Sequence, residues 1–376
     1  MPRITLAAAH TLDDDAAQAK RELIRTEIDA DILSPDAVAF SAVTRIRTAD
    51  GMRGLACLIV LLVHALAYSS ATLAPWLGGA GKIGVWLFFV LSALLLTRRL
   101  NQQHFTRRSL FDYAIGRMLR ILPAYAIAVL LYWRFGTAGI ESWGDVLAAL
   151  TLRRGYAHLW TVPVEFAFYG LLPLFAWALS VIHRRVSQGW MLVACTALIL
   201  VQQALLPYWR TPPNSIDVFW YLPCFLCGSV AAFLLEDRRW QPNAHSADIV
   251  GGACLLLVVV SVPWMQRLLW GRVLIPIDDK FVYFGLLWAL FVFTQARSTG
   301  ILARALGSLA LTTVGRASYS IYLMHWLIVL TILRHWPDNV SACVAAIALS
   351  IAAGQLGWWL VERPSEMLRR RIARVL

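Results

Sequence analysis

One arginine and one histidine frame an apolar stretch that runs from Asp50 to Tyr68, with ten residues between Arg53 and His64. On a helix this spacing puts His64 roughly 16 Å from Arg53, near the middle of an about 30 Å hydrocarbon core if Arg53 marks its edge. A neutral imidazole at that depth can take a proton from a hydroxyl group or attack a thioester itself. His64 is therefore a candidate catalytic residue, and a histidine that only bonds a neighbouring helix is the alternative.

A carboxylate stands at the expected outer mouth of another apolar stretch. Glu165 follows His158 and Trp160 and lies four residues before Tyr169, on the same helical face. Trp and Tyr favour membrane interfaces, so an interfacial belt is one interpretation. Acids inside spans are rare, however, and Glu165 is suited to orient an imidazole, act as a base or bind a sugar hydroxyl.

A second histidine lies inside a later apolar stretch. Ser318, Tyr322 and His325 follow one another at spacings of four and three residues, so they share one helical face. A structural role and a functional role fit His325 equally well.

Three arginines at expected cytoplasmic helix ends are candidates for binding phosphate. Arg117 and Arg120 are three residues apart and share a helical face, while Arg53 directly precedes its span. Guanidinium groups bind phosphate in a bidentate manner, which favours a phosphorylated cytosolic donor. Charge that only sets membrane topology is the alternative for all three.

The composition indicates an integral membrane protein. Of the 376 residues, 59% are hydrophobic and 15% are charged, and the mean hydropathy is +0.62. We expect an all-α, polytopic helical bundle with about ten transmembrane helices. The expected spans lie near 54–71, 82–97, 119–134, 164–182, 190–206, 217–235, 248–263, 281–295, 318–334 and 341–361.

The net charge of +12 is explained by topology and not by nucleic-acid binding, because the arginines lie in short loops beside the spans. Most of the 34 Lys and Arg residues fall on one side when both termini are placed in the cytoplasm. We expect a cytoplasmic tail over 1–45, a membrane domain over 46–365, and a basic cytoplasmic tail over 366–376 that contacts anionic membrane lipids.

Six motifs occur in a characteristic order: DGMRG before His64, GVWLFFVLSALLLT, RMLRILPAY, HLWTVPVEFAFY, GRASYSIYLMH and a closing E-x-P. Between Asp50 and Pro364 the chain thereby resembles the membrane-bound acyltransferase family 3. The resemblance implies about ten spans and transfer of an acetyl or other short acyl group from cytosolic acyl-CoA. The implied acceptor is extracytoplasmic: a surface polysaccharide, a lipid-linked sugar or a glycolipid.

The resemblance also implies roles for the six residues singled out above. They are the catalytic candidates His64, Glu165 and His325 and the donor-binding candidates Arg53, Arg117 and Arg120. The chain departs from the family pattern at Trp86, where an acid is frequent, at Ala93, where Gly is frequent, and at Phe166, where a second Glu is frequent.

We therefore expect a multi-pass inner-membrane O-acyltransferase, in the simplest case an acetyltransferase that uses acetyl-CoA and no metal. His64 would act as a base or as an acyl carrier, and Glu165 would support the acceptor on the outer side. A lipid or sugar transporter or flippase without acyl transfer is the alternative. The short outer loops carry no motif that identifies the acceptor.

Overall fold

The computed structural model describes residues 46, 48–237, 239, 242–274 and 281–375. The predicted tail over 1–45 lies outside the described residues, and the predicted domain boundaries stay predictions. Every regular element within the described ranges is a helix, which confirms the all-α class.

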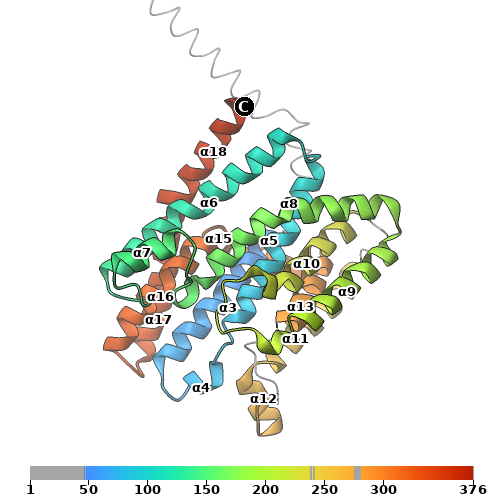
Figure 1. Cartoon of the computed structure of the whole chain (residues 1–376). Coiled ribbons are helices and arrows are strands. Elements are labelled where there is room, and N and C mark those ends of the chain that lie inside the picture. Colours follow the sequence, from blue (N-terminus) through green and yellow to red (C-terminus); the bar gives the residue numbers. More distant parts are fainter. Residues whose placement is uncertain (1–45, 47, 238, 240–241, 275–280, 376) are drawn as a thin grey trace, which may run out of the picture. The chain divides into compact units, whose positions relative to one another are not determined.

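The helices are labelled as in Figure 1. They are α3 (Ala49–Ser69), α4 (Ala74–Leu77), α5 (Lys82–Gln102), α6 (Arg107–Arg134), α7 (Trp143–Leu150), η1 (Ala157–Trp160), α8 (Thr161–Arg185), α9 (Gln188–Leu205), η2 (Tyr208–Arg210), α10 (Val218–Leu234), α11 (Ala244–Val260), α12 (Pro263–Trp270), α13 (Phe281–Gln295), α14 (Ile301–Leu306), α15 (Leu309–Arg316), α16 (Ser318–His335), α17 (Val340–Gly357), the π-helical turn η4 (Trp358–Glu362) and α18 (Arg363–Val375).

The described helices are those of a multi-pass membrane protein. Six are long and apolar enough to cross a bilayer, and the number rises to eight if the bent pairs α11–α12 and α15–α16 each count as one span. Two shorter apolar helices, α10 and α13, coincide with the remaining predicted spans. The predicted count of ten and the predicted orientation of the termini stay predictions.

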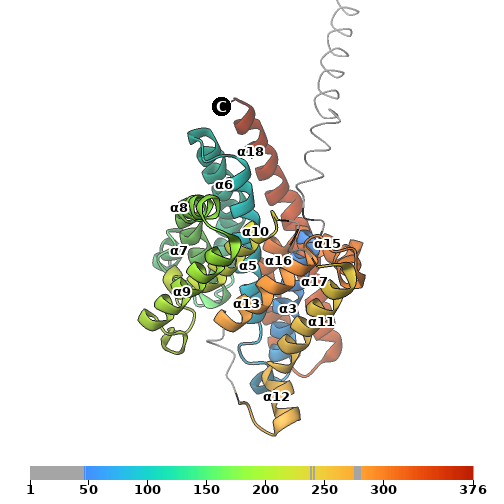
Figure 2. The ribbon, with the colours of Figure 1, turned by 90° about the vertical axis from the view of Figure 1, so that its right-hand side faces the viewer.

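Helices α3 and α5 run through the middle of the bundle (Figures 1 and 2). On one side, α14, α15, α16 and α17 pack against α3. On the other side, α8, α10 and α13 pack against α5, and α3 and α5 pack against each other. Side chains on facing sides of this central pair and its neighbours therefore come together from distant parts of the sequence.

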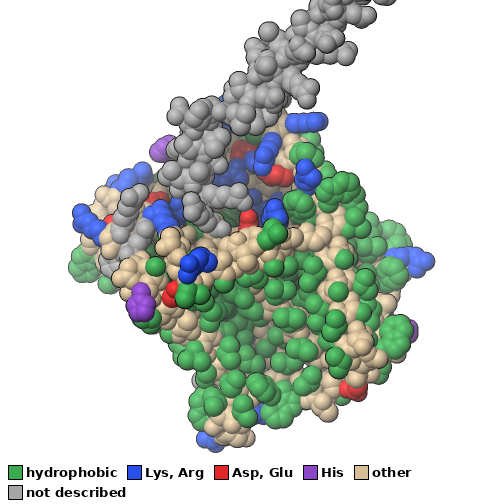
Figure 3. Space-filling view, turned by 180° about the vertical axis from the view of Figure 1, so that it is seen from behind, with side chains coloured by type: hydrophobic (Ala, Val, Ile, Leu, Met, Phe, Trp, Pro, Cys, Tyr) green, Lys and Arg blue, Asp and Glu red, His purple; other side chains and the backbone are tan. Residues whose placement is uncertain are grey.

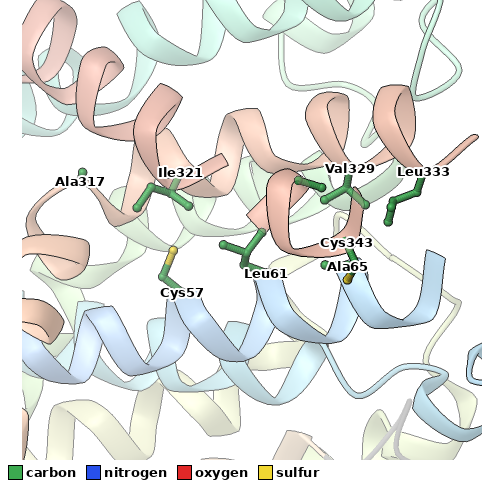
Figure 4. Packing of buried hydrophobic residues seen from close by; sticks show 9 residues of the cluster. Cys57, Leu61, Ala65, Ala317, Ile321, Val329, Leu333 and Cys343 are labelled. Atoms are coloured by element: carbon green, nitrogen blue, oxygen red, sulfur yellow. The ribbon is translucent and has the colours of Figure 1, made fainter. Parts of the chain in front are cut away.

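A stripe of buried apolar residues sets the level of α16 on α3 (Figure 4). Leu61 and Ala65 of α3 are fully buried in one cluster with Ile321 and Val329 of α16. Small residues such as Ala65 let helices approach closely in a membrane. His64 follows Leu61 by three residues, and His325 lies four residues after Ile321 and four before Val329. The packing therefore brings both histidines to the same level.

Two glycines allow the start of α3 to touch α15 through backbone atoms. A Cβ at Gly54 would overlap the carbonyl oxygen of Leu311, and a Cβ at Gly315 would overlap that of Asp50. Arg53 lies beside this contact, so its backbone position is fixed by close packing.

The described surface is divided into apolar and basic regions. Figure 3 shows a broad hydrophobic surface, while most Lys and Arg side chains in that view gather near one end. Helix α18 lies beside α6 (Figure 1), and Arg369 of α18 forms a 2.9 Å ion pair with Asp112 of α6. Asp112 also pairs with Arg99 of α5.

The loop between α6 and α8 is held by a capping box at the start of α7. The Ser142 hydroxyl accepts from the Asp145 amide at 3.2 Å, and the Asp145 carboxylate accepts from the Ser142 amide at 3.0 Å. The Tyr156 hydroxyl donates to the same carboxylate at 2.7 Å. These donors, Ser142 first, hold the pKa of the Asp145 carboxyl below its usual range.

Replacing Ser142 by Ala should destabilise α7 locally by about 1 kcal/mol, because one orphan amide loses its cap. The measurement is amide hydrogen exchange of α7 in the detergent-solubilised protein.

The Asp145 hydrogen bonds stabilise α7 above the ordinary carboxyl pKa of about 3.9, and this stabilisation is lost as the pH falls through the lowered pKa of the folded state. The protection of the α7 amides from hydrogen exchange in the wild type should therefore stay the same from about pH 5 to 8.

The matched control is Ser187→Ala, which removes the N-cap of α9 and should leave exchange in α7 unchanged. Equal protection of α7 in Ser142→Ala and wild type would contradict the capping role.

Candidate active site

Two histidines from different helices form a hydrogen-bonded pair. Nδ1 of His64 on α3 lies 3.0 Å from Nε2 of His325 on α16. The ring planes are nearly parallel, with 14° between them. The sequence singled out both residues, and the structure brings them into direct contact.

The backbone fixes the direction of this hydrogen bond. Nδ1 of His325 lies 2.7 Å from the carbonyl oxygen of Tyr322. A carbonyl only accepts, so this Nδ1 carries the hydrogen, and Nε2 of a neutral His325 is left as an acceptor. His64 must then donate from Nδ1, which leaves the lone pair of its Nε2 free to act as a base.

The free nitrogen of His64 points toward the start of α5. A Cβ placed on Gly81 would lie 3.1 Å from His64 Nε2, so a larger side chain at this position would crowd the ring. His64 lies in the last third of α3, and Arg53 lines a second cavity, described below. The predicted mid-depth position of His64 in the membrane stays a prediction.

A cavity of about 550 Å³ opens beside this nitrogen and is called the histidine cavity. Its lining includes polar and aromatic side chains from five parts of the chain. Among them are His64, Tyr68, Lys82, His158, Asn214, Tyr322 and Trp326. Aromatic faces next to hydrogen-bonding groups suit an organic ligand with both polar and apolar surface.

His158 is a site residue that the sequence argument passed over. Its side chain is 5% exposed, and neither ring nitrogen finds a hydrogen-bond partner among the described residues. The ring stacks on Trp326 at 5.2 Å and lies 4.9 Å from the His325 ring. The histidine in the HLW stretch could have marked it as a candidate, but from the sequence alone this stretch is interpreted only as part of an interfacial belt.

The three rings do not form a metal-ligand cluster. No group of three His, Cys, Asp or Glu side chains in the described ranges is placed to hold a metal ion. The expectation that the chemistry needs no metal stays a prediction.

A second cavity, of about 260 Å³, is lined by arginines and is called the arginine cavity. Its guanidinium groups come from α3, α5 and α6. They belong to Arg53, Arg99, Arg117 and Arg120. Arg117 Nε and Arg120 Nη2 are buried and find no hydrogen-bond partner within the described part of the chain. Clustered cations with unused donors fit a ligand that carries several negative charges.

Arg99 is the arginine that the sequence argument did not include. It lines the cavity together with the three predicted arginines. Asp112 pairs with Arg99 and, at 2.9 Å, with Arg369. The C-terminal helix α18 is thereby linked to the mouth of the arginine cavity.

The structure places Glu165 among the arginines, and its expected role on the acceptor side stays a prediction. Glu165 lines the arginine cavity and not the histidine cavity, and its carboxylate accepts a 2.5 Å hydrogen bond from Ser92. The span was expected to begin at 164, but helical structure begins at Ala157, which carries Glu165 about two turns into the bundle.

Glu362 of the E-x-P motif ties the end of α17 to α16. Its Oε1 accepts from the amide of Ser320 at 3.0 Å and from the Ser320 hydroxyl at 2.6 Å. The π-helical turn η4 ends at this residue, and such turns are frequent at functional sites. Glu362 thus anchors the first turn of α16.

One stripe of α5 joins the two cavities. Its members recur at spacings of four and three residues, which place them on one helical face. They are Gly81, Val85, Phe88, Ser92, Leu95 and Arg99. Val85 and Tyr322 line both cavities, so these two side chains divide one from the other. Between Gly81 and Arg99 the stripe rises roughly 27 Å along the helix axis.

The chain is similar in sequence to known membrane acyltransferases. A family model described as "Acyltransferase domain" matches residues 46–359. The O-acetyltransferase OatA of Staphylococcus aureus is 24% identical over 356 residues, which cover 84% of this chain and 56% of that protein. A membrane-bound transacylase named BcsY, from Komagataeibacter xylinus, is 26% identical over 363 residues, covering 85% of this chain and 82% of that protein.

The peptidoglycan O-acetyltransferase OatA of Listeria monocytogenes is 25% identical over 362 residues, covering 84% of this chain and 55% of that protein. The chain therefore spans little more than half the length of the two OatA relatives. No solved structure matches the chain.

The arginine cavity should bind inorganic pyrophosphate. We expect pyrophosphate to raise the melting temperature of the detergent-solubilised protein, because a ligand that binds only the folded state stabilises it. Arg117→Gln and Arg120→Gln should each weaken this binding by about tenfold or more, since a charge-assisted hydrogen bond contributes about 1.5–3 kcal/mol. Arg107→Gln, at an exposed position on the same helix, is the matched control. Equal pyrophosphate shifts in all three variants would contradict the assignment.

Proposed function

The chain belongs to the acyltransferase family whose model matches residues 46–359, and on that premise we propose that it is a multi-pass inner-membrane O-acyltransferase. It moves an acyl group, in the simplest case acetyl, from cytosolic acyl-CoA to a hydroxyl group of an extracytoplasmic carbohydrate or glycolipid. The free Nε2 of His64, set by the hydrogen bond to His325, is the observation that carries the proposal.

The arginine cavity is the donor side of the proposed reaction. The phosphates of acyl-CoA are multiply charged, and Arg117 and Arg120 offer buried guanidinium nitrogens without partners among the described residues. Arg53 and Arg99 add two further cations. The pantetheine arm then follows the α5 stripe toward His64, which lies at the other end of that stripe.

The proposed chemical step is a proton-assisted acyl transfer. His64 Nε2 takes the proton of the acceptor hydroxyl, and the hydroxyl oxygen attacks the thioester carbon. The new C–O bond forms, the C–S bond breaks, and the proton on His64 passes to the departing sulfur. CoA leaves as the free thiol, and His64 returns to its neutral form.

The histidine pair favours the role of base over that of acyl carrier. As a base, His64 gains a hydrogen on Nε2 and keeps the Nδ1–H that it donates to His325. A neutral acyl-imidazole on Nε2 has no hydrogen on Nδ1, so two lone pairs would face each other across 3.0 Å unless a proton moved onto His325. Direct transfer needs no such rearrangement.

The histidine cavity is the acceptor side of the proposed reaction. Tyr68, Trp326 and Asn214 offer aromatic faces and an amide to a sugar, and the unpartnered nitrogens of His158 suit a hydroxyl group. One relative is named as a peptidoglycan O-acetyltransferase, which supports a carbohydrate as the acceptor. Glu165 serves the donor side, where its bond to Ser92 holds the α5 stripe against α8.

Replacing His64 by Ala should abolish the activity. In inverted inner-membrane vesicles loaded with a cell-surface glycan extract, we expect acetyl transfer from labelled acetyl-CoA to fall about 100-fold or more, because general base catalysis typically contributes ~10²–10⁴-fold. Release of free CoA thiol should fall in parallel. His325→Ala should reduce the rate and alter its pH profile, since the His64 tautomer is no longer fixed.

The control is His335→Ala, which changes an exposed histidine at the end of the same helix. Normal transfer by His64→Ala at normal protein levels would refute the proposed role. Movement of intact glycolipid across the vesicle membrane without thiol release would identify a transporter instead.

A further inference from the structure

One side chain of α5 and one of α16 stand between the two cavities, and the route that a ligand would take between them is called the passage. Val85 and Tyr322 are the side chains that line both cavities, and they are 5% and 7% exposed. Val85 lies one helical turn from Gly81, the position that faces His64 Nε2. A thioester that comes from the arginine cavity must pass these two side chains to reach His64.

The α16 wall of this passage is held in place by hydrogen bonds. The Tyr322 hydroxyl donates to the carbonyl oxygen of His158 at 2.5 Å and accepts from the Thr161 hydroxyl at 2.9 Å. Phe88 contacts the Tyr322 ring edge to face, with 6.3 Å between ring centroids. Swinging this side chain away about χ1 would break two hydrogen bonds in a buried setting, which is costly.

The α5 wall is equally stiff. Val85 is branched at Cβ, and such side chains keep essentially one rotamer on a helix. The neighbouring Gly84 packs against α3, where a Cβ would overlap the carbonyl oxygen of Ala56. The backbone of α5 therefore cannot withdraw from Tyr322 at this level without moving α3.

We propose that the gap between Val85 and Tyr322 selects acyl groups by their width, admitting unbranched short chains and excluding chains branched next to the carbonyl. The inference rests on the proposed acyl transfer and names the residue that sets its donor specificity. The β-alanyl and cysteamine units next to the thioester are unbranched, whereas the dimethyl carbon of the pantetheine arm lies nearer the phosphates and stays on the arginine side of the gap. A gap that accommodates this unbranched end of the arm also accommodates an unbranched acyl chain. An isobutyryl group places two methyl groups on one carbon and meets both stiff walls at once.

The test compares acetyl-, n-butyryl- and isobutyryl-CoA as donors in the vesicle assay. The two butyryl groups have the same number of carbon atoms and differ in branching, so they separate width from length. Wild type should use n-butyryl-CoA better than isobutyryl-CoA. Val85→Ala should raise the isobutyryl-to-n-butyryl ratio by about tenfold or more, because one methylene in an apolar pocket changes discrimination by ~10–200-fold.

Val90→Ala provides the matched control, since it makes the same change on α5 at a fully buried position that lines neither cavity. It should leave the donor ratio as in wild type. Acetyl transfer with an unchanged ratio in Val85→Ala, or equal use of both butyryl isomers by wild type, would overturn the width selection alone. Absence of transfer from every CoA thioester would overturn the proposed function and this inference together.

Discussion

The hydrogen bond between His64 and His325 is the interaction on which the rest of the site depends. It joins two central helices, and its direction follows from the carbonyl oxygen of Tyr322, which can only accept. Buried imidazoles without partners are costly, so this pairing both stabilises the contact between α3 and α16 and defines which nitrogen is free. The apolar cluster around Leu61 and Val329 sets the level at which the pair forms.

A second feature that organises the site is the distance between the cluster of guanidinium groups and the free nitrogen of His64. Guanidinium groups gather at one end of the α5 stripe, and the free imidazole nitrogen lies near the other. A charged headgroup can therefore stay among the arginines while only the uncharged arm of the same molecule reaches His64. Val85 and Tyr322 divide the two environments, and on the proposed route they keep the ionic end of the donor away from the acceptor. The link from Arg99 through Asp112 to α18 shows that the C-terminal helix belongs to the charged end.

The sequence predicted the helical class, the apolar segments and the histidine pair's members, because apolar runs and intramembrane ionisable residues are local signals. It could not predict that His64 and His325 touch, since that depends on packing between segments 261 residues apart. The position of Glu165 beside the arginines could not be predicted, because the helical start at Ala157 is not marked by a side-chain cap. His158 and Arg99 were missed because each has an ordinary interfacial explanation, and only burial without partners or a shared cavity sets them apart.

On the proposed route, an acyl group enters through the arginine cavity and leaves through the histidine cavity. This route can be followed in proteoliposomes with one protein orientation, with labelled acetyl-CoA on the side of the arginine cavity and a cell-surface glycan extract sealed on the opposite side. We expect label on the trapped glycan, and none when donor and glycan are placed together on the arginine side. Label that appears only when donor and glycan share one side would contradict it.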